Sequence, residues 1–328
     1  MSRLRTVCLL GALCAASMHI ANAQEVRASI TGLLTDSSGA PVSGVQVVVT
    51  NVSSNVSVTT QTSDSGNFVT PFLAPGQYEV TVSAQGFKKF VRQNVILQSQ
   101  DKARLDVQLE VGDLATSVTV SDSVTQLQTE TASRAQTLPN EIIANVPTQG
   151  RNPFQIAWAA PGVIKSGSWR YLRSFDIGGT SGISINGGRE RENEVLLDGI
   201  SDVRANRTVI SIPTTESVQE FKVVTNSYDA QYGRTGGGVI SIVTKGGGNS
   251  FHGTAFEYFQ ADNLNANQSE LNRAGIARPP NTINQFGAQV SGPVVIPKVF
   301  NGKNRLFWML SWESLRQRSA EFVEKFVD

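Results

Sequence analysis

Cysteine and histidine are nearly absent from this sequence of 328 residues, which holds two of each. Phosphate-binding loops of the form Gly-x-x-x-x-Gly-Lys-Ser/Thr are absent as well, so the glycines form no nucleotide cradle of that kind. Neither sign of charge dominates, because 28 Lys and Arg stand against 27 Asp and Glu, and this excludes the strongly basic surface typical of nucleic-acid-binding proteins. The residues that are present, 40% apolar and 17% charged, are ordinary for a folded protein, and the length suggests two or three domains.

The first 23 residues have the pattern of a cleaved secretory signal peptide. Arg3 and Arg5 form a basic start, the apolar run 6–18 is too short to span a bilayer as a helix, and Ala21-Asn22-Ala23 is a small-x-small cleavage site. A lipid anchor on Cys14 is the minor alternative, because bulky Leu13 stands where a lipoprotein signal carries a small residue.

Cleavage before Gln24 would remove Cys8, Cys14 and His19, and would leave no cysteine and one histidine, His252. The net charge of the remaining chain is 26 minus 27, or −1. A Ser-His-Asp triad would have to use that one histidine, and a zinc site built from His or Cys would lack ligands. We therefore expect a protein that is not an enzyme and that holds no cofactor and no metal ion.

Residues 24–111 predict a β-sandwich. Short β-branched runs recur at a spacing of about 8 to 12 residues without helical periodicity. The turns between them, such as Asp36 to Gly39 and Pro75-Gly76, place Gly where a positive φ is needed and Asp where its side chain caps the turn. The seven expected strands are 29–34, 45–50, 56–62, 67–73, 77–84, 87–95 and 104–110.

This first zone resembles a carboxypeptidase-regulatory-like domain of the transthyretin and starch-binding type. The resemblance is carried by Ile30 to Val45 (ITGLLTDSSGAPVSGV), Thr62 to Phe68 (TSDSGNF) and Leu73 to Val80 (LAPGQYEV). It implies no catalytic activity, and it favours a spacer or docking module over a sugar-binding site. Four aromatic residues could form a sugar platform, although aromatic residues in so small a sandwich more often fill its core: Phe72, Tyr78, Phe87 and Phe90.

Residues 112–249 differ in texture, since they hold 17 of the 29 Gly. The patterns predict helices at 140–145 and 153–160 and strands at 217–225 and 237–245. Motifs in this zone resemble the plug domain of TonB-dependent outer-membrane receptors, in the Oar-like branch that begins with a regulatory-like sandwich. In chain order they are Pro147 to Phe154 (PTQGRNPF), Ile185 to Arg191 (INGGRER), Leu196 to Ile200 (LLDGI), Val218 to Val224 (VQEFKVV), Tyr228 to Arg234 (YDAQYGR) and Gly236 to Lys245 (GGGVISIVTK). Glycine suits a plug because it permits close backbone approach inside a barrel.

Two groups of polar residues in this second zone have local explanations. Asp198 follows an apolar pair and precedes Gly199, so we expect it to cap a turn, with a ligand role as the alternative. Glu190, Glu192 and Glu194 alternate with Arg189 and Arg191. This alternation predicts a solvated face of a hairpin or loop, with contact to the polar inner wall of a barrel as the alternative.

A short segment between the first two zones, Thr116, Ser117, Val118, Thr119 and Val120, has the β-branched character of a strand. In the receptors that the chain resembles, an extended segment ahead of the plug, the TonB box, adds a strand to the periplasmic energiser TonB. An acidic residue directly before the Thr is missing here. Two interpretations stay open: the segment is the TonB box, or it is the first strand of the plug.

Residues 250–328 predict transmembrane β-strands at 250–260, 282–292 and 304–314, because they combine a length of about ten residues with alternation and terminal aromatic residues. In the last of these, Leu306, Trp308, Leu310 and Trp312 form an apolar face opposite Ser311 and Glu313. His252 begins the first strand and is expected to be an interfacial or lumen residue rather than a metal ligand. The resemblance makes these the first three barrel strands, with 261–281 as an extracellular loop and 293–304 as a periplasmic turn.

A complete barrel needs more residues than this sequence offers. Plugged transporters have about 22 strands of about 10 residues, or roughly 220 residues in strands, whereas 79 residues remain from Ser250 onward. Unclosed strands leave edge hydrogen-bonding groups that a bilayer does not tolerate. We therefore predict the N-terminal part of a longer receptor, unable to transport as it stands.

The predicted fold class is mainly β: a seven-stranded sandwich, an α+β plug and the first strands of an incomplete transmembrane β-barrel. The predicted domains are 1–23 (signal peptide), 24–111 (sandwich), 112–249 (plug) and 250–328 (barrel strands). The resemblance implies an outer-membrane receptor for energised uptake, with TonB and outer-membrane lipid as partners, no nucleic acid, and an unknown substrate of the carbohydrate or peptide class. A carbohydrate-binding or adhesion protein of the cell envelope that uses the sandwich is the alternative, and a peptidase, suggested by the family name of the sandwich alone, is a weaker one.

Overall fold

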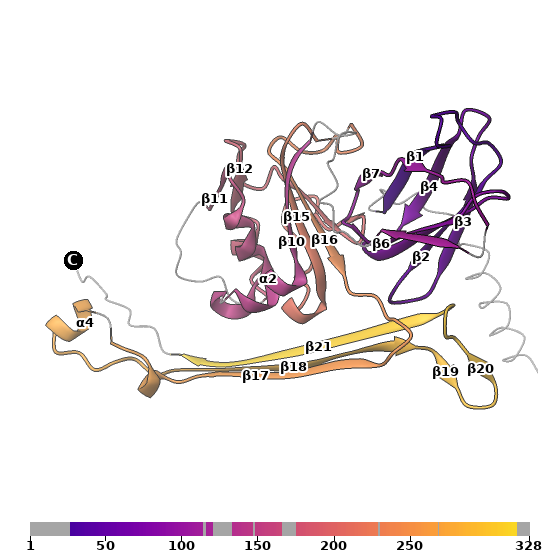
Figure 1. Ribbon diagram of the computed structural model, residues 1–328. Coiled ribbons are helices and arrows are strands. Elements are labelled where there is room, and N and C mark those ends of the chain that lie inside the picture. Colours follow the sequence, from indigo (N-terminus) through magenta and orange to yellow (C-terminus); the bar gives the residue numbers. More distant parts are fainter. Residues whose placement is uncertain are drawn as a thin grey trace, which may run out of the picture.

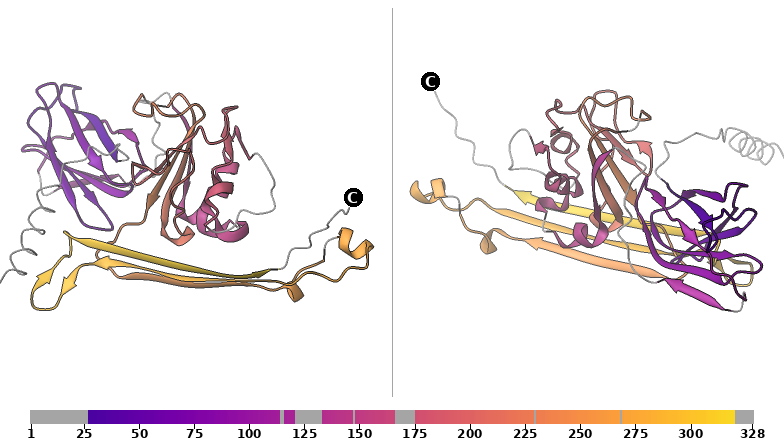
Figure 2. Two further views of the ribbon diagram at one scale, coloured as in Figure 1. Left: turned by 180° about the vertical axis from the view of Figure 1, so that it is seen from behind. Right: turned by 45° about the horizontal axis from the view of Figure 1, so that its top comes forward.

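The computed structural model describes residues 27–113, 116–120, 133–146, 148–165, 175–228, 230–267 and 269–319. The predicted signal peptide and Cys14 lie outside these residues. The described residues form three units (Figure 1): a sandwich from β1 to β9, a plug region comprising the described residues from 133 to 249, and a long sheet of β17, β18 and β21, here called the C-terminal sheet. Figure 2 shows from two further sides that the sandwich and the plug region stand side by side on one face of the C-terminal sheet. The predicted mainly β fold class is confirmed.

The sandwich consists of two sheets. One has the order β4-β1-β7, with β8 also paired to β1, and the other has the order β3-β2-β5-β6-β9. In β1 every second residue is fully buried, because alternate side chains of a strand point to one face. The bounds are β1 (Ala28–Thr35), β2 (Gln46–Asn51), β3 (Ser57–Gln61), β4 (Asn67–Leu73), β5 (Gly76–Ser83), β6 (Lys89–Leu97), β7 (Lys102–Arg104), β8 (Val107–Gln108) and β9 (Ser117–Val120).

The seventh predicted strand, 104–110, is divided in the structure into β7 and β8, which both run parallel to β1. Between them the Leu33 N–H donates to the Asp106 carboxylate at 2.9 Å, and the Leu105 N–H donates to the Thr31 carbonyl at 2.8 Å. A side-chain oxygen thus takes the place of a backbone acceptor and interrupts the ladder. Gly32 permits this close approach, because a Cβ at that position would lie 1.9 Å from the Leu105 carbonyl oxygen.

The plug region contains a five-stranded sheet in the order β10-β15-β16-β13-β14. Strand β15 (Val218–Asn226) is antiparallel to both neighbours, the edge strand β10 (Arg134–Pro139) and the central strand β16 (Val239–Thr244). Strand β16 is parallel to β13 (Glu194–Leu197), which turns into β14 (Ile200–Ser201). The remaining elements are α2 (Asn140–Asn145), η1 (Gln149–Arg151), η2 (Pro153–Ala159), β11 (Val163–Lys165), α3 (Ile177–Thr180), β12 (Ile183–Ile185) and η4 (Thr215–Ser217). Figure 1 shows α2, β11 and β12 on the side of this sheet away from the sandwich.

The core of the plug region joins η2 to β15. The rings of Phe154 and Phe221 pack edge to face with centroids 5.8 Å apart. The predicted helix at 140–145 is confirmed as α2, but the helix predicted at 153–160 is a 3-10 helix, η2. Its start is capped by the Asn152 side chain, which accepts from the Phe154 N–H at 3.0 Å, with Pro153 at the first position.

The C-terminal sheet consists of β17 (His252–Gln260), β18 (Asn281–Pro293) and β21 (Phe307–Ser319), each antiparallel to its neighbour. The last two strands have 13 residues each and are longer than the sequence predicted. A small hairpin of β19 (Val295–Ile296) and β20 (Phe300–Asn301) lies at one end, and η5 (Asp262–Leu264) and α4 (Ser269–Arg273) lie in the connection at the other (Figure 1). Within the described ranges, no helix has the length and apolar character needed to cross a membrane.

The two faces of the C-terminal sheet differ in polarity. On the face turned toward the plug region, three polar side chains are buried: Gln285, Gln289 and Ser291. The opposite face exposes large apolar side chains of β21, with Leu310 64% and Trp312 55% exposed. The apolar face predicted for the last strand is therefore confirmed.

Candidate functional site

The segment with TonB-box character lies on the edge of the sandwich. Strand β9 pairs in parallel with β6, in the register Lys89↔Ser117, Phe90↔Val118, Val91↔Thr119 and Arg92↔Val120. The Lys89 N–H donates to the Thr116 carbonyl at 3.0 Å. The alternative interpretation, that this segment is the first strand of the plug, is wrong in the structure, because β10 occupies the edge of the plug sheet. The role of the segment as a TonB box stays a prediction.

A buried polar cluster joins the sandwich to the plug region. Glu220 on β15 accepts from the Ser99 N–H at 3.0 Å to both carboxylate oxygens and from the Ser99 hydroxyl at 2.5 Å. Lys222, two residues further on the same face of β15, donates to the Ser99 carbonyl at 2.5 Å, and its ammonium lies 3.7 Å from the Asp101 carboxylate. Ser99 is fully buried, and Glu220 and Lys222 are each only 5% exposed. We call Ser99, Asp101, Glu220 and Lys222 the sandwich–plug node.

The electrostatics of this node are set by burial. Desolvation raises the pKa of Glu220 above its usual range, while the hydrogen bonds from Ser99 and the charge of Lys222 act in the opposite direction. A buried pair of this kind requires that every polar group find a partner, because an unpaired buried charge is costly. The node therefore holds the 98–101 loop against β15 in one arrangement.

No pattern in the sequence predicts this node. Glu220 and Lys222 stand at alternate positions of a strand, which is the pattern expected for a solvent-exposed face. The partners Ser99 and Glu220 lie 121 residues apart in the chain. Only the docking of the two units brings them together.

A second set of contacts joins the plug region to the C-terminal sheet. The Arg151 guanidinium lies over the ring of Tyr258 at 3.9 Å from its centroid and over that of Phe256 at 4.9 Å. The same guanidinium forms an ion pair with Glu216 of η4. Nearby, the hydroxyl groups of Thr214 and Ser311 are 2.7 Å apart and share a hydrogen bond. The plug region thus rests on this sheet through aromatic faces and a few polar contacts.

One asparagine at the end of the plug region contacts two other units. The Asn249 side-chain amide donates to the Ser54 carbonyl of the sandwich at 2.7 Å and to the Asn304 side-chain oxygen at 2.6 Å. The Asn304 N–H donates back to the Asn249 side-chain oxygen at 2.8 Å. Asn304 lies in the turn between β18 and β21, so this asparagine ties that turn to the sandwich.

Glycines of the plug region lie where the sequence predicted close packing. A Cβ on Gly188 would lie 2.6 Å from the Gly237 Cα, and a Cβ on Gly237 would lie 2.4 Å from the Asn193 side-chain oxygen. Both clashes lie between the 186–193 loop and the start of β16. Backbone and buried side chain approach one another there at distances that other residues do not allow.

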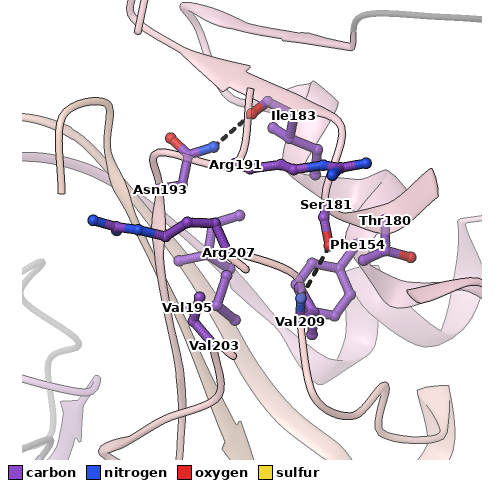
Figure 3. Close-up of a pocket in the computed structure, with 11 residues that line it drawn as sticks. Phe154, Thr180, Ser181, Ile183, Arg191, Asn193, Val195, Val203, Arg207 and Val209 are labelled. Atoms are coloured by element: carbon purple, nitrogen blue, oxygen red, sulfur yellow. Dashed lines mark hydrogen bonds between the residues drawn. The ribbon is translucent and has the colours of Figure 1, made fainter. Parts of the chain in front are cut away.

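A small pocket opens between the plug sheet and its helices (Figure 3), with about 290 Å³ of empty space that includes open solvent at its mouth. Its polar groups are engaged within the fold: Asn193 donates to the Ile183 carbonyl at 2.6 Å, and the Ser181 hydroxyl accepts from the Val209 N–H at 3.0 Å. The side chains of Arg191 and Arg207 extend in different directions in Figure 3 and do not converge on one point. This pocket offers no assembled polar site.

The predictions made from the sequence for the polar residues of the plug region have different outcomes. Asp198 and Gly199 both have positive φ, 50° and 81°, in the turn between β13 and β14, and the Asp198 carboxylate accepts from the Thr244 N–H and hydroxyl at 2.8 Å. Its predicted position in a turn is confirmed, but its side chain binds Thr244 at the end of β16 rather than a backbone group of the turn itself. Glu190 is exposed as predicted, but the prediction for Glu194 is wrong, because it is 2% exposed and accepts from the Ser201 hydroxyl. Glu194 begins β13, in register with Val239 of β16, and its side chain is covered within the fold.

The four aromatic residues of the sandwich do not form one platform. Tyr78 is 3% exposed, and Phe87 and Phe90 pack against the same core, as the interpretation of core residues predicted. Phe72 differs, since it is 60% exposed and adopts a φ of 63°.

Histidine and acidic residues do not gather into a metal-binding group: over the described part of the chain, no three His, Cys, Asp or Glu side chains lie close enough to hold an ion. His252 begins β17, pairs in register with Ser291 and is exposed. It shares the plug-facing parity of Phe256, which agrees with the second of the two predicted positions, interfacial or lumen.

Comparison with known proteins supports this architecture at both ends. Residues 29–110 match the family model of the carboxypeptidase regulatory-like domain, and residues 243–327 match that of an outer membrane beta barrel domain. A regulatory-like sandwich followed by outer-membrane barrel strands defines the same class that the motifs indicated, so the predicted resemblance to Oar-like TonB-dependent receptors is confirmed.

One relative is the TonB-dependent transporter Oar of Myxococcus xanthus, which is 27% identical over 306 residues. The match covers 88% of this chain and 28% of that protein, so the chain spans less than a third of the relative's length. The siderophore receptor PirA of Acinetobacter baumannii matches 56% of this chain and 24% of its own at 20% identity and a TM-score of 0.39. The ferric enterobactin receptor PfeA of Pseudomonas aeruginosa matches 49% and 22% at 22% identity and a TM-score of 0.34. Both TM-scores describe a weak overall likeness.

Proposed function

We propose that this chain supplies the sandwich, the plug and barrel strands of a TonB-dependent outer-membrane receptor for energised substrate uptake, without covalent chemistry. The observation that carries the proposal is the polarity of the C-terminal sheet. Buried Gln285, Gln289 and Ser291 face the plug region, while exposed Leu310 and Trp312 face away. Polar-in and apolar-out alternation is the arrangement of a transmembrane barrel wall around a plug.

The proposal includes the domain boundaries 24–111, 112–249 and 250–328, after a signal peptide of residues 1–23, and the segment 116–120 at the start of the second domain pairs with the sandwich sheet as β9. It places the C-terminal sheet in the outer membrane and the sandwich on its periplasmic side. The partners are outer-membrane lipid and the energiser TonB, which would bind the segment 116–120 and pull on the plug. The substrate is of the carbohydrate or peptide class, and no residue of this chain breaks a bond in it.

Two contacts described above would resist a pull on the plug. The sandwich–plug node holds β15, and the Arg151 contacts hold η1 and η4 against the C-terminal sheet. In the proposed receptor, opening a path requires that the plug region rearrange relative to the sheet.

Fractionation of cells that express the gene containing this chain tests the proposal. We expect the product in the outer-membrane fraction and retained by an immobilised periplasmic domain of TonB. Recovery as a soluble periplasmic protein without affinity for TonB would contradict it.

A carbohydrate-binding role of the sandwich is the second candidate, and exposed Phe72 favours it, because sugar rings stack on exposed aromatic faces. Titration of the chain with oligosaccharides should then give saturable binding that Phe72→Ala abolishes. Absence of saturable binding would remove this candidate.

A further inference from the structure

We propose that the sandwich presents β9 as a preformed docking edge, onto which the periplasmic domain of TonB adds a strand while β9 stays paired with β6. This inference rests on the proposed function, and it concerns how the segment 116–120 is offered rather than whether it binds. The occupant of the edge is a strand of the partner, recognised through backbone hydrogen bonds.

The topology supplies the open edge. Strand β9 is the last strand of the order β3-β2-β5-β6-β9, so one of its edges is paired with β6 and the other is unpaired in the described sheet. Figure 2 shows the magenta strand at the rim of the sandwich. An unpaired strand edge presents a row of N–H and C=O groups to an incoming strand.

The register shows which backbone N–H and C=O groups of β9 point away from β6. The Thr116 carbonyl accepts from the Lys89 N–H, so it points toward β6. Because successive residues of a strand direct their backbone groups to opposite edges, Val118 and Val120 also face β6, whereas Thr119 turns its N–H and C=O outward.

Pairing with β6 also lowers the cost of binding. A free segment must lose backbone conformational entropy when it becomes a strand. The four residues of β9 are already extended in the sandwich sheet. A partner that adds to the open edge does not bear that cost again, which is the general advantage of a preorganised site.

A disulfide staple between β6 and β9 tests the proposal in the full chain, which is kept in detergent. The substitutions Cys8→Ser and Cys14→Ser are included so that no other thiol is present. The variant pair Arg92→Cys and Val120→Cys joins residues in register between β6 and β9. The control pair Gln77→Cys and Ile96→Cys joins β5 to β6 in the same sheet and leaves β9 untouched. Binding to the purified periplasmic domain of TonB is measured before and after oxidation, and disulfide formation is followed by mass spectrometry.

We expect both disulfides to form and the stapled chain to bind TonB at least as tightly as the reduced chain. A loss of tenfold or more in the stapled chain, with the control pair unchanged, would overturn the proposal, because it would show that TonB must strip β9 from β6. Failure of the Arg92–Val120 pair to oxidise while the control pair does so would overturn it as well, since β9 would then not lie on β6. If the disulfide forms but neither state binds TonB, the proposed function itself fails.

A backbone variant sharpens the test. Thr119→Pro removes the outward N–H and leaves the groups facing β6 in place, so we expect the staple to form and TonB binding to fall at least tenfold. Its matched control is Val118→Pro, which removes an inward N–H and should instead impair formation of the staple. Undiminished binding by Thr119→Pro would contradict docking on the outer edge.

Discussion

The plug region is held from two sides by contacts of different chemistry. Toward the sandwich, Glu220 and Lys222 are each 5% exposed and meet Ser99 through short, charge-assisted hydrogen bonds. Toward the C-terminal sheet, Arg151 lies on two aromatic rings, of which Tyr258 is 47% exposed. Directional hydrogen bonds between buried groups allow one arrangement, whereas a guanidinium over a ring face tolerates displacement. The comparison suggests that the sandwich and plug region form the firmer unit, and that rearrangement begins at the sheet.

The largest expected effect is at the contact between the plug region and the sandwich. Glu220→Ala leaves the Ser99 N–H and hydroxyl without their buried acceptor and removes the negative charge that acts on Lys222, which should cost about 3 to 5 kcal/mol. Hydrogen exchange of the β15 amides in the full chain measures this loss. Glu141→Ala, an exposed glutamate of α2, is the matched control. Equal protection of the β15 amides in Glu220→Ala and Glu141→Ala would contradict the claim that the sandwich–plug node stabilises this contact.

The next largest effect is expected at the contact between the plug region and the C-terminal sheet. Arg151→Ala removes the ion pair with Glu216 and the stacking on Tyr258, with an expected cost of about 2 kcal/mol. Exchange of the β17 and η4 amides should rise while that of β15 stays the same. Arg151→Lys keeps the charge but not the planar stacking and should fall between wild type and alanine. A rise in β15 exchange equal to that in β17 would show that the two sides are one cooperative contact.

The pH dependence should separate the two sides further. The folded pKa of Glu220 is raised by burial, so folding penalises its charged form, and this penalty is fully present above the raised pKa. Acidification from neutral pH toward 4.5 therefore relieves the penalty, and β15 protection should increase through that window. Glu220→Gln carries no titrating group, so its β15 protection should lack this increase. A wild-type protection that falls over the same window would mean that the charged form is favoured, with Lys222 outweighing desolvation.

The smallest effect concerns one neutral hydrogen bond. Ser311→Ala removes the partner of the Thr214 hydroxyl, for an expected cost of about 0.5 to 1.5 kcal/mol. Ser314→Ala, on the outward face of the same strand, should be close to neutral. Exchange of the η4 amides distinguishes the two variants. An effect of Ser311→Ala as large as that of Arg151→Ala would place the main strength of the sheet contact at Thr214.

Much of the fold followed from local patterns. Strands such as 67–73 and the Asp198-Gly199 turn could be predicted because alternation and positive φ are local properties. The division between β7 and β8 could not, because it depends on Asp106 reaching Leu33 across 73 residues. The helical turns of 153–160 were predicted, but not their 3-10 geometry, since the sequence signals for the two helix types overlap at this length.

The candidate site was harder to predict than the fold. The strand character of 116–120 could be read from its β-branched residues, but its pairing with β6 could not, because the residue types that favour a strand do not name its neighbour. The same limit applies to Glu220, which a single sequence cannot distinguish from a solvated strand residue. Arg151 is of the same kind, since its partners Tyr258 and Glu216 lie in other units or elements.

The contacts of Asn249 bear on the order in which the units assemble. Its side chain links the turn before β21 to the sandwich, through Asn304 on one side and Ser54 on the other. The chain is synthesised from its N-terminus, so the sandwich is complete before the strands of the C-terminal sheet emerge. The hairpin of β18 and β21 therefore meets a finished surface on which its turn can be positioned, and in the proposed receptor its apolar face is oriented before it reaches lipid.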